Sequence, residues 1–211
     1  MKKLISLLVA AILTVPAIYA EPVSAKRQKE LKKECKTKSK QLHKAGWEIL
    51  GSAYTLDGAL QNHYNKLAEL GDDAIEVFGT STRVKSKNAG VQMAINNACI
   101  TYAQQQGSDL KGRVISELNA DVNNPDLEMD KFFNAYERTV EKEIKGEMRP
   151  SYQIVRSNSD GTYEIEVYFI INDSAASAAR IRAMEQSMNE SEYAQRHAAK
   201  ISDFVKAGFK N

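Results

Sequence analysis

Residues 151–171, with the sequence SYQIVRSNSDGTYEIEVYFII, give the clearest structural signal in this chain and predict a β-hairpin. The segment Asn158-Ser159-Asp160-Gly161 divides it and favours a tight turn, because Asn, Asp and Gly tolerate the backbone conformations that hairpin turns use. After the turn, apolar residues occur at every second position: Tyr163, Ile165, Val167, Phe169 and Ile171. This alternation is typical of antiparallel strands with one face against a hydrophobic core.

Helices and further strands surround the hairpin in the sequence. Apolar residues three and four positions apart predict helices at about 26–44, 56–70, 88–106, 126–145 and 174–209, the last with a bend at 189–191. Strand-like composition predicts strands at 47–51, 74–84 and 110–118, with Gly107 ending the helix before the third of them. We expect an α+β fold, with a mainly antiparallel sheet of about four to five strands and helices packed on one face. Long N- and C-terminal helices complete it, and we expect them to pair as an antiparallel arm.

The first residues have the parts of a secretory signal peptide. Lys2 and Lys3 precede the apolar run Leu4–Val15, and small residues follow. We expect cleavage after Ala20, and Val23-Ser24-Ala25 offers an alternative site. The apolar run is too short for a mature membrane anchor, so we expect no transmembrane anchor in the mature chain.

Export sets the expected location and the division of the chain. The residue after the predicted cut is Glu21, not a cysteine, so we expect no lipid anchor. We expect a periplasmic or secreted protein, with peripheral attachment to the outer membrane as an alternative. The segments are a signal peptide at 1–20, a basic helix at 21–45 and the α+β domain at 46–211.

Positive charge is concentrated near the N-terminus. The whole chain has 29 basic and 27 acidic residues and a net charge of only +2, which does not suggest a nucleic-acid partner. Residues 26–44 nevertheless contain nine lysine and arginine residues against Glu30 and Glu34. A solvated helix face is one interpretation, and contact with anionic lipid, an anionic surface polymer or an acidic protein is the other. The candidate contacts are Lys26, Arg27, Lys29, Lys32, Lys33 and Lys36.

The chain has two cysteines, Cys35 and Cys99. An exported protein can keep a disulfide, so a Cys35–Cys99 bridge is one hypothesis. Both cysteines also fall on apolar helix faces, where a thiol acts as a small buried hydrophobe. The two interpretations stay open.

Three stretches resemble a known bacterial family. They are Asn97–Ala103 with Leu110–Val114, Tyr136–Glu147, and Tyr163–Ile171 with Ala175–Arg180. Together they resemble the LPP-twenty lipoprotein-like domain and the N-terminal module of flagellar assembly protein T, over residues 46–205. The whole chain looks like exported proteins of Bacteroides-type bacteria. The resemblance implies an envelope-associated α+β domain without known enzymatic activity, and it transfers no functional residue.

The sequence contains few candidates for chemistry. The histidines are His43, His63 and His197, and none has the spacing of a metal-binding pair, so we expect no metal and no cofactor. His63 lies on an apolar helical line, which favours a core histidine with its hydrogen bonds satisfied. No hydrolase, nucleotide or dinucleotide motif occurs in the sequence.

One polar cluster is the remaining candidate site. Arg113, Glu137 and Arg138 lie on neighbouring predicted elements, where surface ion pairing is the simpler interpretation and a ligand cleft the alternative. We therefore expect a protein that is not an enzyme, but a structural or interaction module of the cell envelope that binds a protein or a surface polymer. The alternative is a small-ligand-binding protein or a hydrolase of the periplasm.

Overall fold

The computed structural model describes residues 25–118 and 126–208. Its helices are α1 (Ala25–Lys44), α2 (Leu56–Leu70), α3 (Lys87–Leu118), α4 (Asp126–Glu147), α5 (Asp173–Ser187), α6 (Glu192–Arg196) and α7 (Ala198–Ala207), with short 3-10 turns η1 (Gly71–Asp73) and η2 (Met188–Glu190). Its strands are β1 (Trp47–Ile49), β2 (Ala74–Val84), β3 (Pro150–Ser157) and β4 (Tyr163–Asn172). The chain has the α+β fold that the sequence predicts.

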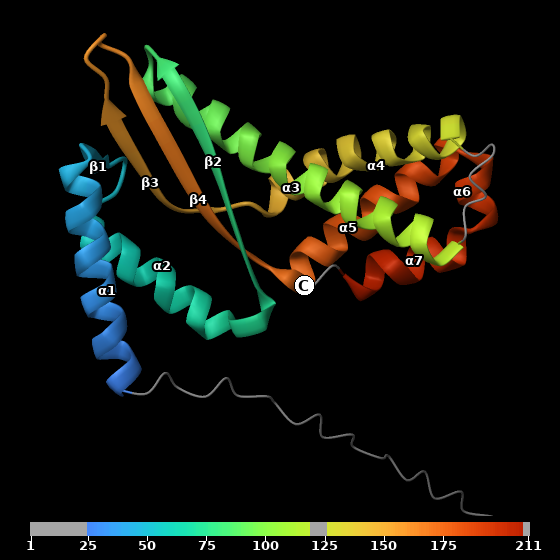
Figure 1. Ribbon diagram of the computed structural model, residues 1–211, viewed down its shortest axis with the longest axis horizontal. Helices are drawn as coiled ribbons and strands as arrows, with labels where there is room; N and C mark the ends of the chain where they lie inside the picture. The colour runs from blue at the N-terminus through green and yellow to red at the C-terminus, as the bar shows by residue number, and fades with distance from the viewer. Residues whose placement is uncertain (1–24, 119–125, 209–211) are drawn as a thin grey trace, which may run out of the picture.

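The four strands form one antiparallel sheet in the order β1-β3-β4-β2 (Figure 1). The predicted hairpin is confirmed as β3 and β4, in which Val155 lies opposite Ile165. β2 pairs with the other side of β4, where Val77 lies opposite Phe169. Within the described residues, β2 therefore has a neighbouring strand on one side only and forms an edge of the sheet.

Helices cover both faces of this sheet. On one face, the buried side chains of β2 and β4 pack under α3, and the same hydrophobic cluster continues into α4, α5 and α7. On the other face, Tyr152 and Ile154 of β3 form a second cluster with residues of α1 and α2. The sequence predicts helices on one face only. The structure differs because β3 carries apolar side chains on both of its faces, so its outer face needs a cover as well.

A single long helix replaces the helix and strand predicted for 88–118. α3 continues through Gly107, and Leu110 and Val114 extend its buried stripe. Gly107 does not end the helix but allows close packing, since a Cβ there would lie only 2.3 Å from Cγ of Glu137 on α4. The predicted strand at 110–118 is wrong because that glycine serves the contact between two helices.

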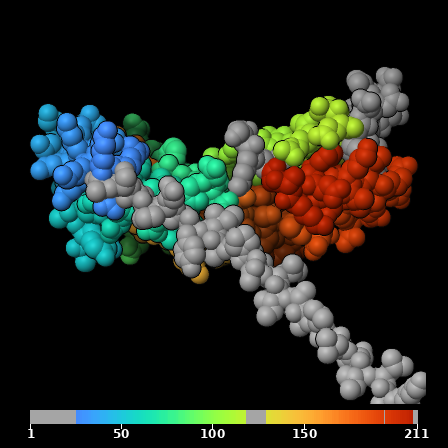
Figure 2. Space-filling model, turned by 90° about the horizontal axis from the view of Figure 1, so that it is seen from below, coloured from blue at the N-terminus to red at the C-terminus, as the bar shows by residue number. Residues whose placement is uncertain are grey.

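The terminal helices lie at opposite ends of the molecule and do not form the expected arm (Figures 1 and 2). α1 packs on α2 and β1, whereas α7 packs on α5 and α3. The predicted bend is confirmed, because the C-terminal helical segment breaks at η2 and resumes where the Ser191 hydroxyl accepts from the backbone N–H of Ala194. In the described ranges, every helix is too short or too polar to cross a membrane.

Candidate functional site

The candidate site centres on His63, which α2 presents to the sheet. Thr55 fixes the start of this helix, since its hydroxyl accepts from the backbone N–H of Gly58 at 3.2 Å. His63 then falls on the same helical face as Leu56 and Leu60, and its side chain is fully buried. The sequence therefore places an imidazole ring between a helix and a sheet.

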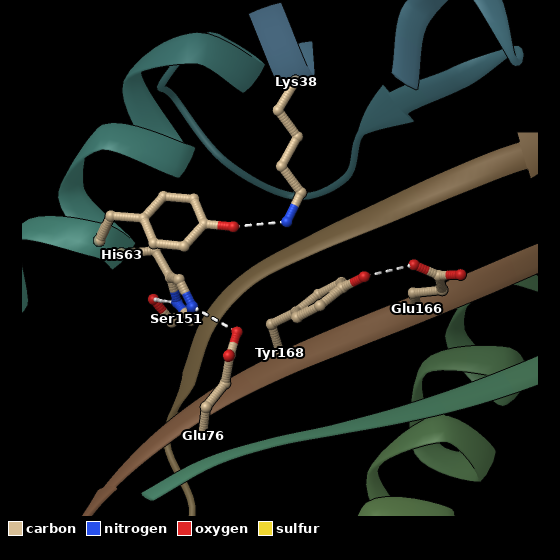
Figure 3. A network of polar contacts seen from close by, with 7 residues as sticks. Lys38, His63, Glu76, Ser151, Glu166 and Tyr168 are labelled. Carbon is tan, nitrogen blue, oxygen red and sulfur yellow. Dashed lines mark hydrogen bonds and ion pairs between the residues drawn. The ribbon is translucent and has the colours of Figure 1, made fainter. Parts of the chain in front are cut away.

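Both ring nitrogens of His63 have polar partners on the sheet (Figure 3). Nε2 lies 2.8 Å from Oε1 of Glu76 on β2, and Nδ1 lies 2.9 Å from Oγ of Ser151 on β3. A neutral ring with its hydrogen on Nε2 satisfies both contacts: it donates to the carboxylate and accepts from the hydroxyl. The expected core histidine with satisfied hydrogen bonds is confirmed, and it joins α2, β2 and β3.

Three tyrosines enclose the ring. The rings of Tyr64, Tyr152 and Tyr168 stand edge-on to His63, with centroids 5.4, 5.1 and 6.3 Å away. Tyr152 and Tyr168 stack on each other at 4.4 Å. Burial raises the pKa of both hydroxyls, so both tyrosines stay neutral, and Tyr168 donates to Glu166 at 2.7 Å. The histidine thus lies in an aromatic, water-poor environment.

Charged side chains lie at the rim of this cluster. The hydrogen bond from His63 lowers the pKa of the Glu76 carboxyl, although partial burial opposes the shift. On the α1 side, Lys38 donates to the hydroxyl of Tyr64, and its Nζ lies 5.1 Å from the centre of that ring. The contact of His63 with Glu76 attaches α2 to the sheet, and the contact of Lys38 with Tyr64 attaches α1 to α2.

The order Ser151–His63–Glu76 resembles the nucleophile, base and carboxylate of a serine hydrolase. In such an enzyme the histidine passes a proton to the leaving group, so it must reach the substrate. Here Ser151 is exposed and the Glu76 side chain is 43% exposed, whereas the ring between them is fully buried. This distribution of exposure favours a structural tie over a catalytic relay.

The two cysteines lie in different hydrophobic clusters, on opposite faces of the sheet. Both are buried and both are free thiols, which corrects the hypothesis of a Cys35–Cys99 bridge. The Cys99 thiol donates to the sulfur of Met148 at 3.4 Å. Burial raises the pKa of each thiol, so neither has the character of a reactive nucleophile.

The predicted polar cluster is only partly assembled. Glu137 and Arg138 line a shallow groove of about 400 Å³ between α3 and α4. Arg113 lies farther along α3, outside this lining, where it acts on Asp109 of the same helix. The reason is the change from strand to helix at 110–118, which places Arg113 nine positions farther along α3 than Gln104, the last α3 residue of the lining.

The predicted basic residues of α1 are all exposed: Lys26, Arg27, Lys29, Lys32, Lys33 and Lys36. Arg27 differs from the lysines, since its Nη1 lies 3.9 Å from Glu30 and 3.8 Å from Glu34. The predicted cleavage site at Ala20 lies outside the described residues.

Sequence reasoning missed three residues that the fold buries or pairs: Glu76, Ser151 and Arg180. The Arg180 side chain is 2% exposed and donates through Nη1 to the Tyr102 hydroxyl at 2.9 Å. Its position among the alanines of α5 was a usable signal. Small side chains indicate that a helix packs closely against its neighbours, here α4, so an arginine on the same face is expected to be buried. Glu76 and Ser151 gave no signal, since each becomes significant only beside His63.

In the part of the chain that the structure describes, no three His, Cys, Asp or Glu side chains gather to hold a metal ion. No protein-family model, curated protein or solved structure matches this chain. The resemblance to the LPP-twenty lipoprotein-like domain therefore stays a prediction.

Proposed function

We propose that this chain is an exported, non-enzymatic interaction module of the cell envelope, and that it docks on an anionic surface polymer through one face of α1. Export rests on the signal-peptide pattern that ends at Ala20. Docking rests on one observation, a row of lysines without acidic partners. The partner class is a polymer with repeated negative charges, such as lipopolysaccharide.

The lysines of α1 form a continuous basic face. At 3.6 residues per turn, seven exposed lysines fall within an arc of about 120° and along about 27 Å of the helix. They are Lys26, Lys29, Lys32, Lys33, Lys36, Lys40 and Lys44. We call this set the lysine face. Its length suits a polymer with repeated charges better than a single small anion.

Acidic residues are absent from the lysine face. The two carboxylates of α1, Glu30 and Glu34, lie beside the lysine face, along a groove of about 650 Å³ next to Tyr64 that Lys33 also lines. There they pair with Arg27. Among the described residues, none of the seven lysines lies in an ion pair, so their charges stay available to an external anion.

The rest of the chain supports the same direction of binding. The whole chain carries a net charge of only +2, although α1 alone has nine basic residues and two acidic ones. The remainder is therefore net acidic and is repelled by a negative surface, which orients the molecule with α1 toward it. Figure 2 shows α1 at one end of the molecule, where such contact meets no obstacle from the C-terminal helices.

The test compares two variants with the same change in net charge. In the first, Lys29, Lys33, Lys36 and Lys40 of the lysine face become glutamine. In the second, four exposed lysines of other helices become glutamine: Lys131, Lys142, Lys200 and Lys206. Sedimentation with lipopolysaccharide at low salt measures binding. Because each lysine near an anionic surface contributes about 1 kcal/mol, the first variant should bind at least about tenfold more weakly.

The control variant should bind within about twofold of the original protein, since its lysines lie outside the lysine face. Binding should also fall as salt rises, because the contacts are electrostatic. Equal weakening of the two variants would show attraction by net charge alone and would refute the lysine face. The absence of binding at low salt would refute the polymer as partner.

Hydrolysis is a second candidate function, which the contacts of Ser151 with His63 favour. Its test is the release of nitrophenol from p-nitrophenyl acetate. Activity that disappears in Ser151→Ala, with the unfolding midpoint unchanged, would support a hydrolase and contradict the non-enzymatic proposal. Activity that remains in Ser151→Ala would come from residues other than Ser151 and would contradict a serine hydrolase at this site.

A further inference from the structure

The edge strand β2 carries main-chain hydrogen-bonding groups that the fold leaves open. The side-chain amide of Asn97 on α3 donates to the carbonyl of Thr80 at 2.8 Å, so the backbone of Thr80 faces away from β4. Backbone groups alternate in direction along a strand, and the same outward direction follows for Phe78 and Glu76. Among the described residues, none forms a hydrogen bond with these outward groups of Phe78 and Glu76.

A groove follows this edge between β2 and α3. It has a volume of about 280 Å³ and is lined by residues 76–80 together with Asn97, Thr101, Tyr102 and Gln105. Asn97, Thr101 and Gln105 are exposed and four residues apart, so they form a polar row on the helical wall. On the other side of the edge, Phe78 is 54% exposed. The groove thus combines an open backbone, a polar wall and an exposed aromatic ring.

From this arrangement we infer that β2 binds an extended segment of another protein, which adds to the sheet as a fifth strand in the groove beside α3. An open strand edge specifies its occupant, because only an extended backbone can pair with alternating N–H and C=O groups. This inference is independent of the lysine face and concerns a different surface.

A second copy of this chain fits the groove poorly. A Cβ on Gly79 would lie 1.9 Å from the carbonyl oxygen of Ala94, so α3 crosses directly over the middle of β2. Antiparallel pairing of two β2 strands centred there would set the two α3 helices on the same face, only about 5 Å apart. Packed helices need about 8–10 Å between their axes. An extended segment brings no helix with it and avoids this clash.

The groove also indicates the chemistry of the segment. Asn97 already donates to the Thr80 carbonyl, so the residues with both outward groups open are Glu76 and Phe78, which allow about four main-chain hydrogen bonds. A residue beside Phe78 gains from being apolar or aromatic, as cross-strand neighbours do. A residue beside Glu76 gains from being basic, since that carboxylate stays 43% exposed while His63 holds one of its oxygens. We expect a short segment with alternating apolar and basic or polar residues.

The test selects peptides from a random decapeptide phage library on the purified full chain, with counter-selection on Phe78→Pro. Proline is tolerated where a strand N–H faces away from the sheet, so this variant should keep its pairing with β4 and lose one outward donor. Selected peptides should bind the original protein at least tenfold more tightly than Phe78→Pro. N-methylation of the peptide amides that face β2 should cause a similar loss.

Hydrogen exchange on the original protein provides a readout that needs no variant. A bound peptide should slow exchange at the backbone amides of Glu76 and Phe78. The glutamine variant of the lysine face should bind the peptides unchanged, so failure of one proposal is distinguishable from failure of the other. The inference is overturned if no peptide discriminates against Phe78→Pro, or if protection appears elsewhere. Self-association that protects the same amides would overturn it in favour of a second copy.

Discussion

The two faces of the sheet are stabilised in different ways. Among the described residues, the main cluster beneath α3 and its neighbours has 29 buried residues and continues into α4, α5 and α7. The second cluster, beneath α1 and α2, has only eight buried residues in the same part of the chain. Since apolar burial contributes in proportion to area, the second cluster supplies a much smaller share of the stability. Its helices therefore depend more on polar contacts with the sheet.

Polar and aromatic contacts are accordingly concentrated around the second cluster. His63 joins α2 to two strands, and Lys38 donates to Tyr64 across the contact of α1 with α2. At the far edge, the guanidinium of Arg156 lies 4.8 Å from the ring of Trp47 and its Nε donates to Glu164 at 3.1 Å. We therefore expect the layer of α1 and α2 to open more readily than the helical layer on the other face of the sheet.

The largest predicted effect comes from removing an aromatic side chain in the main cluster. Phe169 on β4 is fully buried, and Phe169→Ala should lower the free energy of unfolding by about 3–5 kcal/mol. Leu60→Ala on α2 tests the second cluster, and Leu110→Ala on α3 is the matched change in the main cluster, since both leucines are fully buried. Urea unfolding followed by circular dichroism measures the free energy of unfolding of all three variants. A loss in Leu60→Ala as large as in Leu110→Ala would contradict the comparison.

The two cysteines report on the two clusters separately. Cys35 lies in the second cluster and Cys99 in the main cluster, and burial raises the pKa of both thiols. Opening of α1 alone exposes Cys35, whereas Cys99 needs a larger unfolding. Cys35 should react with a maleimide at least about tenfold faster than Cys99 under native conditions. Labelling of Cys35→Ser and Cys99→Ser assigns the two rates, and equal rates would mean that both layers open together.

Much of the fold follows from local sequence patterns. The alternation in 151–171 predicts the hairpin, the strand-like composition of 74–84 predicts β2 with those bounds, and the apolar spacing in 56–70 predicts α2 with those bounds. These features depend on residues that are near one another in the chain. Local patterns therefore carry enough information to place them.

The features that sequence reasoning missed depend on distant residues. Gly107 resembles a helix end until Glu137 packs against it from α4. His63 meets Glu76 and Ser151, which lie 13 and 88 positions away. The helical cover on the second face of the sheet is missed for the same reason. Tyr152 and Ile154 share one face of β3, and their spacing does not say whether a helix covers that face. Such contacts need the three-dimensional arrangement, which periodicity alone does not specify.

The pH dependence of stability should reveal how much the contact between His63 and Glu76 stabilises the second cluster. The hydrogen bond from His63 lowers the pKa of Glu76 in the folded state below its ordinary value of 4.5. A lowered folded pKa contributes stability that is present above 4.5 and is lost as the pH falls through the folded value. Because Glu76 is partly exposed, this contribution should be about 0.5–1 kcal/mol.

Glu76→Gln tests this contribution, since it keeps the shape of the side chain and removes its titration. Thermal unfolding at pH 7 and at pH 3 should show a smaller acid-induced loss in Glu76→Gln than in the original protein. Protonation of thiols slows maleimide labelling in acid, so the Cys35 rate is divided by that of a free thiol at the same pH; this ratio should rise in acid, because α1 and α2 loosen together. An acid-induced loss of the same size in both proteins would show that the His63–Glu76 contact does not stabilise the layer.

The smallest effect is expected at an ion pair on the rim of the main cluster. Lys111 Nζ lies 2.9 Å from Oδ1 of Asp130, and the two side chains are 48% and 51% exposed. Water screens such a pair and its side chains lose entropy, so Asp130→Asn should change the free energy of unfolding by less than about 0.5 kcal/mol. Lys111 keeps its position 5.6 Å from the ring of Phe133 in this variant, which further limits the loss. Thermal unfolding of Asp130→Asn and of Glu76→Gln at pH 7 measures the loss of stability in each variant. An equal loss of stability in Asp130→Asn and Glu76→Gln would mean that the main cluster also depends on polar contacts at its rim. The two faces of the sheet would then differ only in the apolar area that they bury.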